Sequence, residues 1–354
     1  MKKVLFILFF LITLSFFSFA QIRVLFIGNS YTSVNNLPQL ILNCAKSAGD
    51  NMEYSANTPG GYTFQNHLTS SAPYIQEGNW DYVVLQEQSQ LPSFLFNQFM
   101  SVCYPYAQQL CQMIRQYNSN AQIVFYMTWG RKNGDQQNAV YYPVLGTYQG
   151  MDSLLYARYM MLAEDNDAVV SPVGALWHYI RDNYPQIQLY QSDESHPSMA
   201  GSYAAACSFY SVLFKKNPNL ITYVPSSIEP DIADIIRQAA KTVVYDSLSK
   251  WLFVPQDDTM NIADTTFISF YEKPKVEIYP NPAHNNLFVN FYAPSHTDIT
   301  INIYSISGQL MFSEENITSS SNFLDISTIP SGSYVLKAFY EQGCIYSKPI
   351  IITK

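Results

Sequence analysis

The chain has 354 residues, of which 48% are hydrophobic, and a formal net charge of −8 at pH 7. This length exceeds the usual size of one domain, so we expect two domains, each with enough apolar residues for its own core. The negative charge, without any stripe of lysine and arginine, argues against nucleic acid as a partner, because phosphate binding needs a basic surface.

Residues 1–20 have the pattern of a secretory signal peptide. Two lysines follow Met1, an apolar run extends from Val4 to Phe17, and small residues precede Gln21. The run is shorter than the ~20 apolar residues that a membrane-spanning helix needs. We therefore expect an exported chain with no transmembrane span after the signal peptide is removed.

The five cysteines show no spacing that is typical of a metal site. They include no Cys-x-x-Cys pair, and no histidine lies at ligand spacing from them. We therefore expect neither a bound metal nor a cofactor, and the sequence selects no pair for a disulfide.

A first strand is predicted at residues 22–27, where β-branched and aromatic side chains indicate burial on both faces. Gly28, Asn29 and Ser30 follow with the residue types of a tight turn. Ser30 therefore falls at the carboxyl end of a central strand, where open α/β sheets bind their ligands. A serine at that point is a candidate nucleophile if a base, an orienting acid and oxyanion donors lie nearby.

Strands and helices alternate along the first 250 or so residues. Such alternation favours a parallel sheet with helices on its faces. Residues 131–150 are polar, rich in tyrosine and without clear period, and we interpret them as a rim or lid beside the site. Further strands are predicted at 52–56, 81–85, 122–127 and 168–170, and helices at 37–48, 98–117, 151–164, 173–183, 198–214 and 230–251.

Small or polar residues follow the second and third predicted strands. Gly60 and Gly61 can bring a backbone N–H close to a reacting oxygen because glycine has no Cβ, although such a pair also serves as an ordinary sharp turn. Gln86, Gln88 and Gln90 share one side of the chain by strand parity. They are either site residues or a polar network that caps the strand.

A loop before the predicted helix at 198–214 holds Asp193 and His196 three residues apart. Pro197 prevents the helix from starting earlier and restricts that loop. The histidine is either structural or, if Ser30 lies close to it, the general base for that serine.

The order of these motifs resembles that of the SGNH or GDSL hydrolases. The resemblance implies a flavodoxin-like three-layer α/β/α fold with a parallel sheet. It also implies that Ser30 is the nucleophile, His196 the general base and Asp193 the acid that orients the base. The backbone N–H groups of Ser30 and of Gly60 or Gly61 would be the oxyanion donors.

The resemblance covers about residues 22–250, and we expect the catalytic domain at 21–251. The sequence departs from the family's pattern in two places. Asn29 stands where an aspartate is usual, and the asparagine that follows the third strand is absent. Gln88 or Gln90 would then supply the third oxyanion donor, and the register of the turn leaves both open.

A second domain is predicted at residues 276–354, after a linker at 252–275. Its apolar pattern has a period of two, which is typical of a small all-β sandwich. The segments at 276–282 and 303–308 resemble the C-terminal sorting domain of the type IX secretion system. The resemblance implies contact with the secretion machinery, export across both membranes of a diderm bacterium, and removal of the domain on arrival; a sugar-binding sandwich is the alternative. Strands are predicted at 287–291, 299–304, 334–338 and 350–352.

Together these features predict a secreted or cell-surface serine esterase, and we favour O-acetyl groups on a carbohydrate as its substrate. The ester chemistry follows from the predicted site. The carbohydrate follows from the family resemblance, the extracellular address and an aromatic rim of Tyr31, Tyr62 and Trp129. A lipid or thioester hydrolase of the same family and a non-catalytic surface protein that binds glycans are the alternatives.

Overall fold

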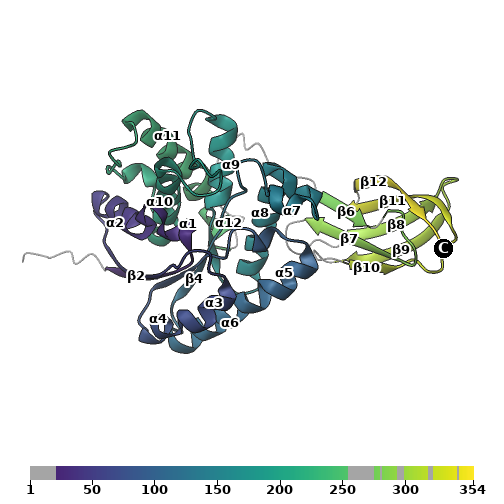
Figure 1. Cartoon of the computed structure of the whole chain (residues 1–354), viewed down its shortest axis with the longest axis horizontal. Helices are drawn as coiled ribbons and strands as arrows, with labels where there is room; N and C mark the ends of the chain where they lie inside the picture. The colour runs from purple at the N-terminus through teal and green to yellow at the C-terminus, as the bar shows by residue number, and fades with distance from the viewer. Residues whose placement is uncertain (1–20, 254–274, 280, 293–298, 318–321, 341–342) are drawn as a thin grey trace, which may run out of the picture.

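A computed structural model describes residues 21–253, 275–279, 281–292, 299–317, 322–340 and 343–354 (Figure 1). The predicted signal peptide and all but the ends of the predicted linker lie outside the described residues. The described elements form an α/β part up to residue 253 and an all-β part from residue 275.

Five parallel strands form the sheet of the α/β part, in the order β2-β1-β3-β4-β5. This is the strand order of flavodoxin-like folds, and the predicted fold class is confirmed. Strand β1 was expected to be central, but it is the second of the five strands and β3 is the middle one. It is still buried from Val24 to Ile27, because strands pair with it on both edges and helices cover both faces. The strands are β1 (Ile22–Ile27), β2 (Met52–Asn57), β3 (Tyr82–Leu85), β4 (Gln122–Tyr126) and β5 (Val169–Ser171).

Helices cover both faces of the sheet (Figure 1). Right-handed crossovers explain the division, because the step from β1 to β2 runs opposite to the later steps along the sheet. Within the described residues, no helix is both long enough and apolar enough to span a membrane. One face carries α2 (Leu37–Ser47), α9 (Val173–Asn183), α10 (Met199–Phe214) and α11 (Pro230–Ala240), and the other carries α3 (Phe64–Ser70), α4 (Ala72–Glu77), α5 (Phe96–Val102), α6 (Tyr104–Tyr117) and α8 (Tyr148–Glu164).

Several helices differ from the predicted ones. Helices α3 and α4, which connect β2 to β3, were not predicted. The single helix expected at 98–117 is broken at Cys103, because Pro105 lacks the N–H that a continuous helix needs. Residues 131–150 are not structureless, since they contain α7 (Gln136–Ala139) and a 3₁₀ turn at Pro143–Gly146. The helix expected at 230–251 is three elements, namely α11, a π turn at Lys241–Tyr245 and α12 (Leu248–Trp251).

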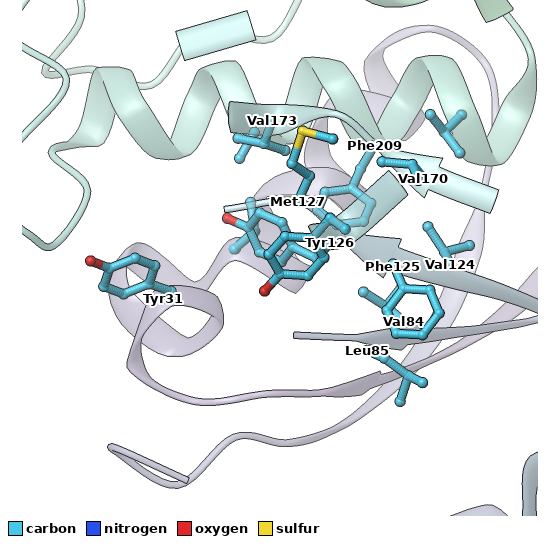
Figure 2. Packing of buried hydrophobic residues seen from close by; sticks show 14 of the residues in the cluster. Tyr31, Val84, Leu85, Val124, Phe125, Tyr126, Met127, Val170, Val173 and Phe209 are labelled. Carbon is cyan, nitrogen blue, oxygen red and sulfur yellow. The ribbon is translucent and has the colours of Figure 1, made fainter. Parts of the chain in front are cut away.

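The core of the α/β part lies between the sheet and its helices. Figure 2 shows buried side chains of β3, β4 and β5 side by side, with Phe209 of α10 among them. The Phe209 ring meets the Tyr126 ring edge to face at 4.9 Å and the Phe26 ring at 6.0 Å. These contacts hold α10, which begins just after the predicted acid and base, against the strands that end near Ser30.

The C-terminal part is an antiparallel β-sandwich. Its two sheets have the orders β10-β7-β6 and β12-β11-β8-β9. Leu287 and Leu324 of the first sheet share one buried core with Ile301, Leu336 and Ile350 of the second. The strands are β6 (Lys275–Tyr279), β7 (Asn286–Tyr292), β8 (Ile299–Ser305), β9 (Leu310–Ile317), β10 (Asn322–Asp325), β11 (Gly332–Tyr340) and β12 (Gly343–Ile352), of which β6, β9 and β10 were not predicted.

Candidate active site

Ser30 is the first residue of α1 (Ser30–Ser33), immediately after the corner that ends β1. Asn29 caps this helix, because its side-chain oxygen accepts a hydrogen bond from the Tyr31 N–H at 3.1 Å. The same residue joins the corner to the neighbouring loops, since its N–H donates to Gln86 Oε1 and its Nδ2 donates to the Tyr62 carbonyl, both at 2.9 Å. Asn29, which stands where an aspartate was expected, therefore caps the helix and fixes the corner before Ser30.

His67 holds this corner through a hydrogen bond to the backbone of Gly28. Its imidazole is fully buried, and Nε2 lies 2.8 Å from the Gly28 carbonyl oxygen. Burial lowers the pKa of His67 to about 4, so the ring is neutral at pH 7 and its Nε2–H donates to that carbonyl. The sequence held no sign of this contact, because His67 lies in a helix that was not predicted.

The structure brings Ser30, His196 and Asp193 into one hydrogen-bonded chain. His196 Nε2 lies 2.9 Å from Ser30 Oγ, and His196 Nδ1 lies 2.5 Å from Asp193 Oδ2. Both side chains of the loop reach solvent, with 31% of His196 and 47% of Asp193 exposed. Ser30 is itself only partly buried.

The Asp193 carboxylate is held in its ionised form. Its small degree of burial raises its pKa, but hydrogen bonds from the His196 ring and from the N–H groups of Ser195 and His196 outweigh that effect and lower the pKa. An ionised Asp193 accepts the Nδ1–H of His196. The lone pair of Nε2 is then directed at the Ser30 hydroxyl, which is the arrangement that a general base needs.

Buried aromatic rings anchor the loop that carries Asp193 and His196. Trp129 Nε1 donates to the Ser195 carbonyl at 3.1 Å, and the Tyr31 hydroxyl lies 2.7 Å from Ser195 Oγ. Tyr31 stacks on Trp129 at 4.7 Å between centroids, and Trp129 stacks on Trp177 of α9 at 3.7 Å. The stack fixes the residue next to His196 against the helix that carries Ser30.

The prediction that Tyr31 and Trp129 form an exposed aromatic rim is therefore wrong. Only 2% of Tyr31 and none of Trp129 is exposed, because both rings lie beneath the loop at 191–197 rather than around it. Tyr62 is half-buried, so it alone of the three retains a surface that a substrate can touch.

The turn at Gly60 and Gly61 lies beside the Ser30 corner, to which the bond between Asn29 and the Tyr62 carbonyl ties it. Both glycines are exposed, and Gly61 has a φ of +73°, which favours glycine. Within the described residues, the N–H groups of Ser30, Gly60 and Gly61 make no hydrogen bond to another protein atom. These three N–H groups are therefore free to donate to a ligand.

The three glutamines after β3 do not share one side. The strand ends at Leu85, so strand parity does not extend to them. Gln86 is fully buried and bonds to Asn29, whereas Gln88 Nε2 donates to Gln90 Oε1 at 3.1 Å. Gln90 Nε2 in turn donates at 2.7 Å to Asp135, a fully buried residue of the predicted lid.

Glu87 is a buried carboxyl group that the sequence did not single out. It accepts hydrogen bonds from the Phe64 N–H at 3.0 Å and from the Gln88 N–H at 2.6 Å, and Cys103 lies beside it. Burial raises the pKa of Glu87 to about 8. Because Phe64 begins α3 just after the glycine turn, Glu87 joins the two loops that hold the candidate oxyanion donors.

Comparison with known families identifies the C-terminal part. Residues 277–353 match the model described as the secretion system C-terminal sorting domain, so the predicted sorting domain is confirmed. A search of curated proteins found no match to the chain.

Comparison with solved structures concerns the α/β part. A DUF4886 family protein from Bacteroides uniformis matches with a TM-score of 0.56 and 18% identity, covering 64% of this chain and 95% of that one. A candidate SGNH hydrolase from Slackia heliotrinireducens gives 0.44 and 24%, covering 55% and 99%. An acetylxylan esterase from Geobacillus stearothermophilus gives 0.37 and 14%, covering 53% and 91%. At these identities the likeness is one of fold, and the similar structures include SGNH hydrolases, as the sequence resemblance predicted.

Replacing Glu87 by glutamine is expected to change how stability depends on pH. The folded-state pKa of about 8 lies above the usual 4.5, so between these values the folded protein holds a proton that the unfolded chain has lost. The free energy of unfolding of the wild type therefore falls as pH rises from 5 to 8, by roughly 1 kcal/mol per pH unit. Glu87→Gln removes this contribution. Denaturant unfolding of both proteins at pH 5, 6.5 and 8 measures the difference. Other groups such as His67 titrate alike in both proteins, so their contribution cancels in the comparison. Parallel plots of unfolding free energy against pH for the two proteins would contradict the raised pKa of Glu87.

Proposed function

We propose that residues 21–251 form a serine hydrolase that cleaves carboxylic esters. The observation that carries the proposal is the hydrogen-bonded chain from Asp193 through His196 to Ser30. These three side chains lie at the carboxyl end of the inner strand β1 and reach solvent. This combination of nucleophile, base and orienting acid is what acyl transfer requires.

In the proposed reaction His196 Nε2 takes the proton of Ser30 Oγ while that oxygen attacks the ester carbonyl carbon. The resulting imidazolium is stabilised by the ionised Asp193, whose position on Nδ1 also fixes the ring. His196 then gives the proton to the leaving alcohol, which leaves an acyl group on Ser30. A water molecule, deprotonated by the same histidine, then attacks that acyl group; the bond to Ser30 Oγ breaks, His196 returns the proton to Ser30 Oγ, and the acid is released.

The negative oxygen of the tetrahedral intermediate is assigned to the Ser30 N–H and to the N–H of Gly60 or Gly61. The free state of these groups and the bond between Asn29 and the Tyr62 carbonyl support the assignment. A third donor is assigned to the side-chain amide of Gln88 or Gln90. Both amide nitrogens already donate, but Gln88 is favoured because its bond to the neutral Gln90 Oε1, at 3.1 Å, is easier to exchange for a substrate oxygen than the 2.7 Å bond from Gln90 to the buried Asp135 carboxyl group.

We propose O-acetylated carbohydrate as the substrate class. The sorting domain indicates export, and polysaccharides are abundant outside cells. The open site and the half-buried Tyr62 next to Ser30 are compatible with a sugar ring. Hydrolysis of lipid esters or thioesters, and glycan binding without catalysis, are the outcomes that would replace this proposal.

The sorting domain indicates that a secretion system recognises the chain, and we propose a secreted or cell-surface location in a diderm bacterium. In this proposal residues 1–20 are a signal peptide, residues 252–275 are a linker, and the domain at 276–354 is removed after export.

Ser30→Ala is expected to abolish hydrolysis of p-nitrophenyl acetate, because the attacking oxygen is lost; removal of a member of such a triad typically costs about 10⁴-fold or more in kcat. Ser33→Ala is the matched control, since Ser33 is exposed on the same helix and lies outside the chain of hydrogen bonds. Retention of esterase activity by Ser30→Ala would refute the proposed function.

A series of p-nitrophenyl esters of increasing chain length, compared with acetate release from acetylated xylan, distinguishes carbohydrate from lipid substrates.

Gln88→Ala is expected to lower kcat by roughly 10²–10³ with little change in KM, because an oxyanion donor acts mainly in the transition state. Gln90→Ala should have the smaller effect on kcat if Gln88 is the donor, and Gln65→Ala, at an exposed position of α3, is the control. If the two single variants and the double variant all keep the kcat of the wild type, the third oxyanion donor is neither Gln88 nor Gln90.

The mature extracellular protein is expected to end near residues 252–275. Intact-mass spectrometry of the protein from the culture medium or the cell surface measures its C-terminus. A mature product that still contains residues 276–354 would contradict removal of the sorting domain.

A further inference from the structure

A groove lies between the segment that follows Ser30 and the helix that follows His196. Its volume of about 170 Å³ equals the space of roughly five or six water molecules, which suits a single sugar ring. Every residue that lines it in the described part of the chain is uncharged. The side chains used below are Asn36, Gln39, Asn43, Met199 and Tyr223.

Both walls of the groove continue from segments that carry the catalytic residues, although Ser30, Asp193 and His196 do not themselves line it. Asn36 ends the 3₁₀ turn (Val34–Asn36) that continues directly from α1, so it lies within about two turns of Ser30. On the opposite wall Met199 begins α10, three residues after His196. Asn35 joins the two walls, because its Nδ2 donates to the Pro197 and Ser198 carbonyls at 3.1 and 3.0 Å.

The amide groups of the groove keep hydrogen-bonding capacity for a ligand. Gln39 Nε2 donates to Asn43 Oδ1 at 2.9 Å, and Gln39 Oε1 accepts from the Tyr54 hydroxyl at 3.2 Å. Within the described residues, Asn43 Nδ2 and the side chain of Asn36 bond to no other protein atom. Each amide offers both donors and an acceptor, which matches the hydroxyl groups of a sugar.

The backbone at this point is held in an uncommon conformation. Asn35 and Asn36 have φ values of 56° and 50°, in the left-handed region that side-chain-bearing residues rarely adopt. Asparagine tolerates this region better than most residues. The conformation places the Asn36 side chain on the exposed wall of the groove, where it faces solvent rather than the core.

The uncharged, amide-rich side chains that line the groove favour one class of ligand over others. A phosphate or a uronate would meet no cationic side chain among the lining residues. An acyl chain would remove water from amides that it cannot pair, which costs free energy. A neutral sugar satisfies the amides through its hydroxyls and can place its apolar face on the ring of Tyr223.

We propose that this groove is a subsite for a neutral polysaccharide, holding the sugar next to the one whose acetyl ester reaches Ser30. The proposal rests on the proposed esterase function and narrows its substrate to uncharged, hydroxyl-rich chains. The contacts made here are remote from the ester carbon, so they act on binding of oligosaccharides and not of small aryl esters.

The test uses Asn36→Gly together with Asn43→Ala in the full chain. Glycine suits the left-handed backbone at 36 and alanine suits helix α2, so both amides are removed without backbone strain. The ratio of kcat/KM for acetylated xylo-oligosaccharides to that for p-nitrophenyl acetate is expected to fall about 30-fold, as two hydrogen bonds are lost. Gln112→Ala, which removes an exposed amide from α6 on the opposite face of the sheet, should keep the wild-type ratio.

Calorimetric binding of xylotetraose and mannotetraose, which carry no ester, tests the groove without any need for catalysis. Wild-type protein is expected to bind at least one of them, and the double variant about 30-fold more weakly. An unchanged ratio and unchanged affinity in the double variant, or no binding of either sugar by the wild type, would overturn the subsite. If the wild-type protein hydrolysed no ester at all, the proposed function would be wrong instead. The calorimetric binding of the two sugars would then be the test of whether the groove is a sugar subsite.

Discussion

Asn29 holds the ends of three parallel strands together, and the rest of the site depends on its hydrogen bonds. Its backbone follows β1, its Nδ2 bonds to the Tyr62 carbonyl after β2, and its N–H bonds to Gln86 after β3. Parallel strands all end at one edge, so a single side chain of this size can reach two neighbouring loops. Ser30 is the next residue, and its position relative to the candidate oxyanion donors is set by these bonds.

Two polar side chains of the site, Glu87 and His67, are buried and neutral, whereas Asp193 is exposed and charged. The pKa of Glu87 is raised to about 8 and that of His67 lowered to about 4, so at pH 6 to 7 both groups are uncharged. Glu87 and His67 therefore position the loops around the serine corner without adding charge. Asp193 lies at the surface, where its hydrogen bonds lower its pKa and it remains an anion that can stabilise a protonated His196.

Asp193 and His196 are positioned by the packing of aromatic rings against their loop as well as by the loop itself. The rings of Tyr31, Trp129 and Trp177 form one stack that ends in hydrogen bonds to Ser195, the residue before His196. The loop thereby depends on both α1 and α9. On its other side Asn35 connects the same loop to the groove that we assign to a sugar. Ester cleavage and glycan binding would share one supporting framework.

The sequence alone was sufficient for the fold class, the sorting domain and the residue types of the candidate triad, because these depend on local periodicity and on the order of short motifs. Only the tertiary structure decided which aromatic residues are exposed and where each glutamine points. Tyr31 and Trp129 are buried by a loop that is distant in sequence, and Gln86 turns to a residue 57 positions away. Burial and side-chain partners arise from contacts between remote segments, and a pattern that repeats over two to four residues carries no information on them.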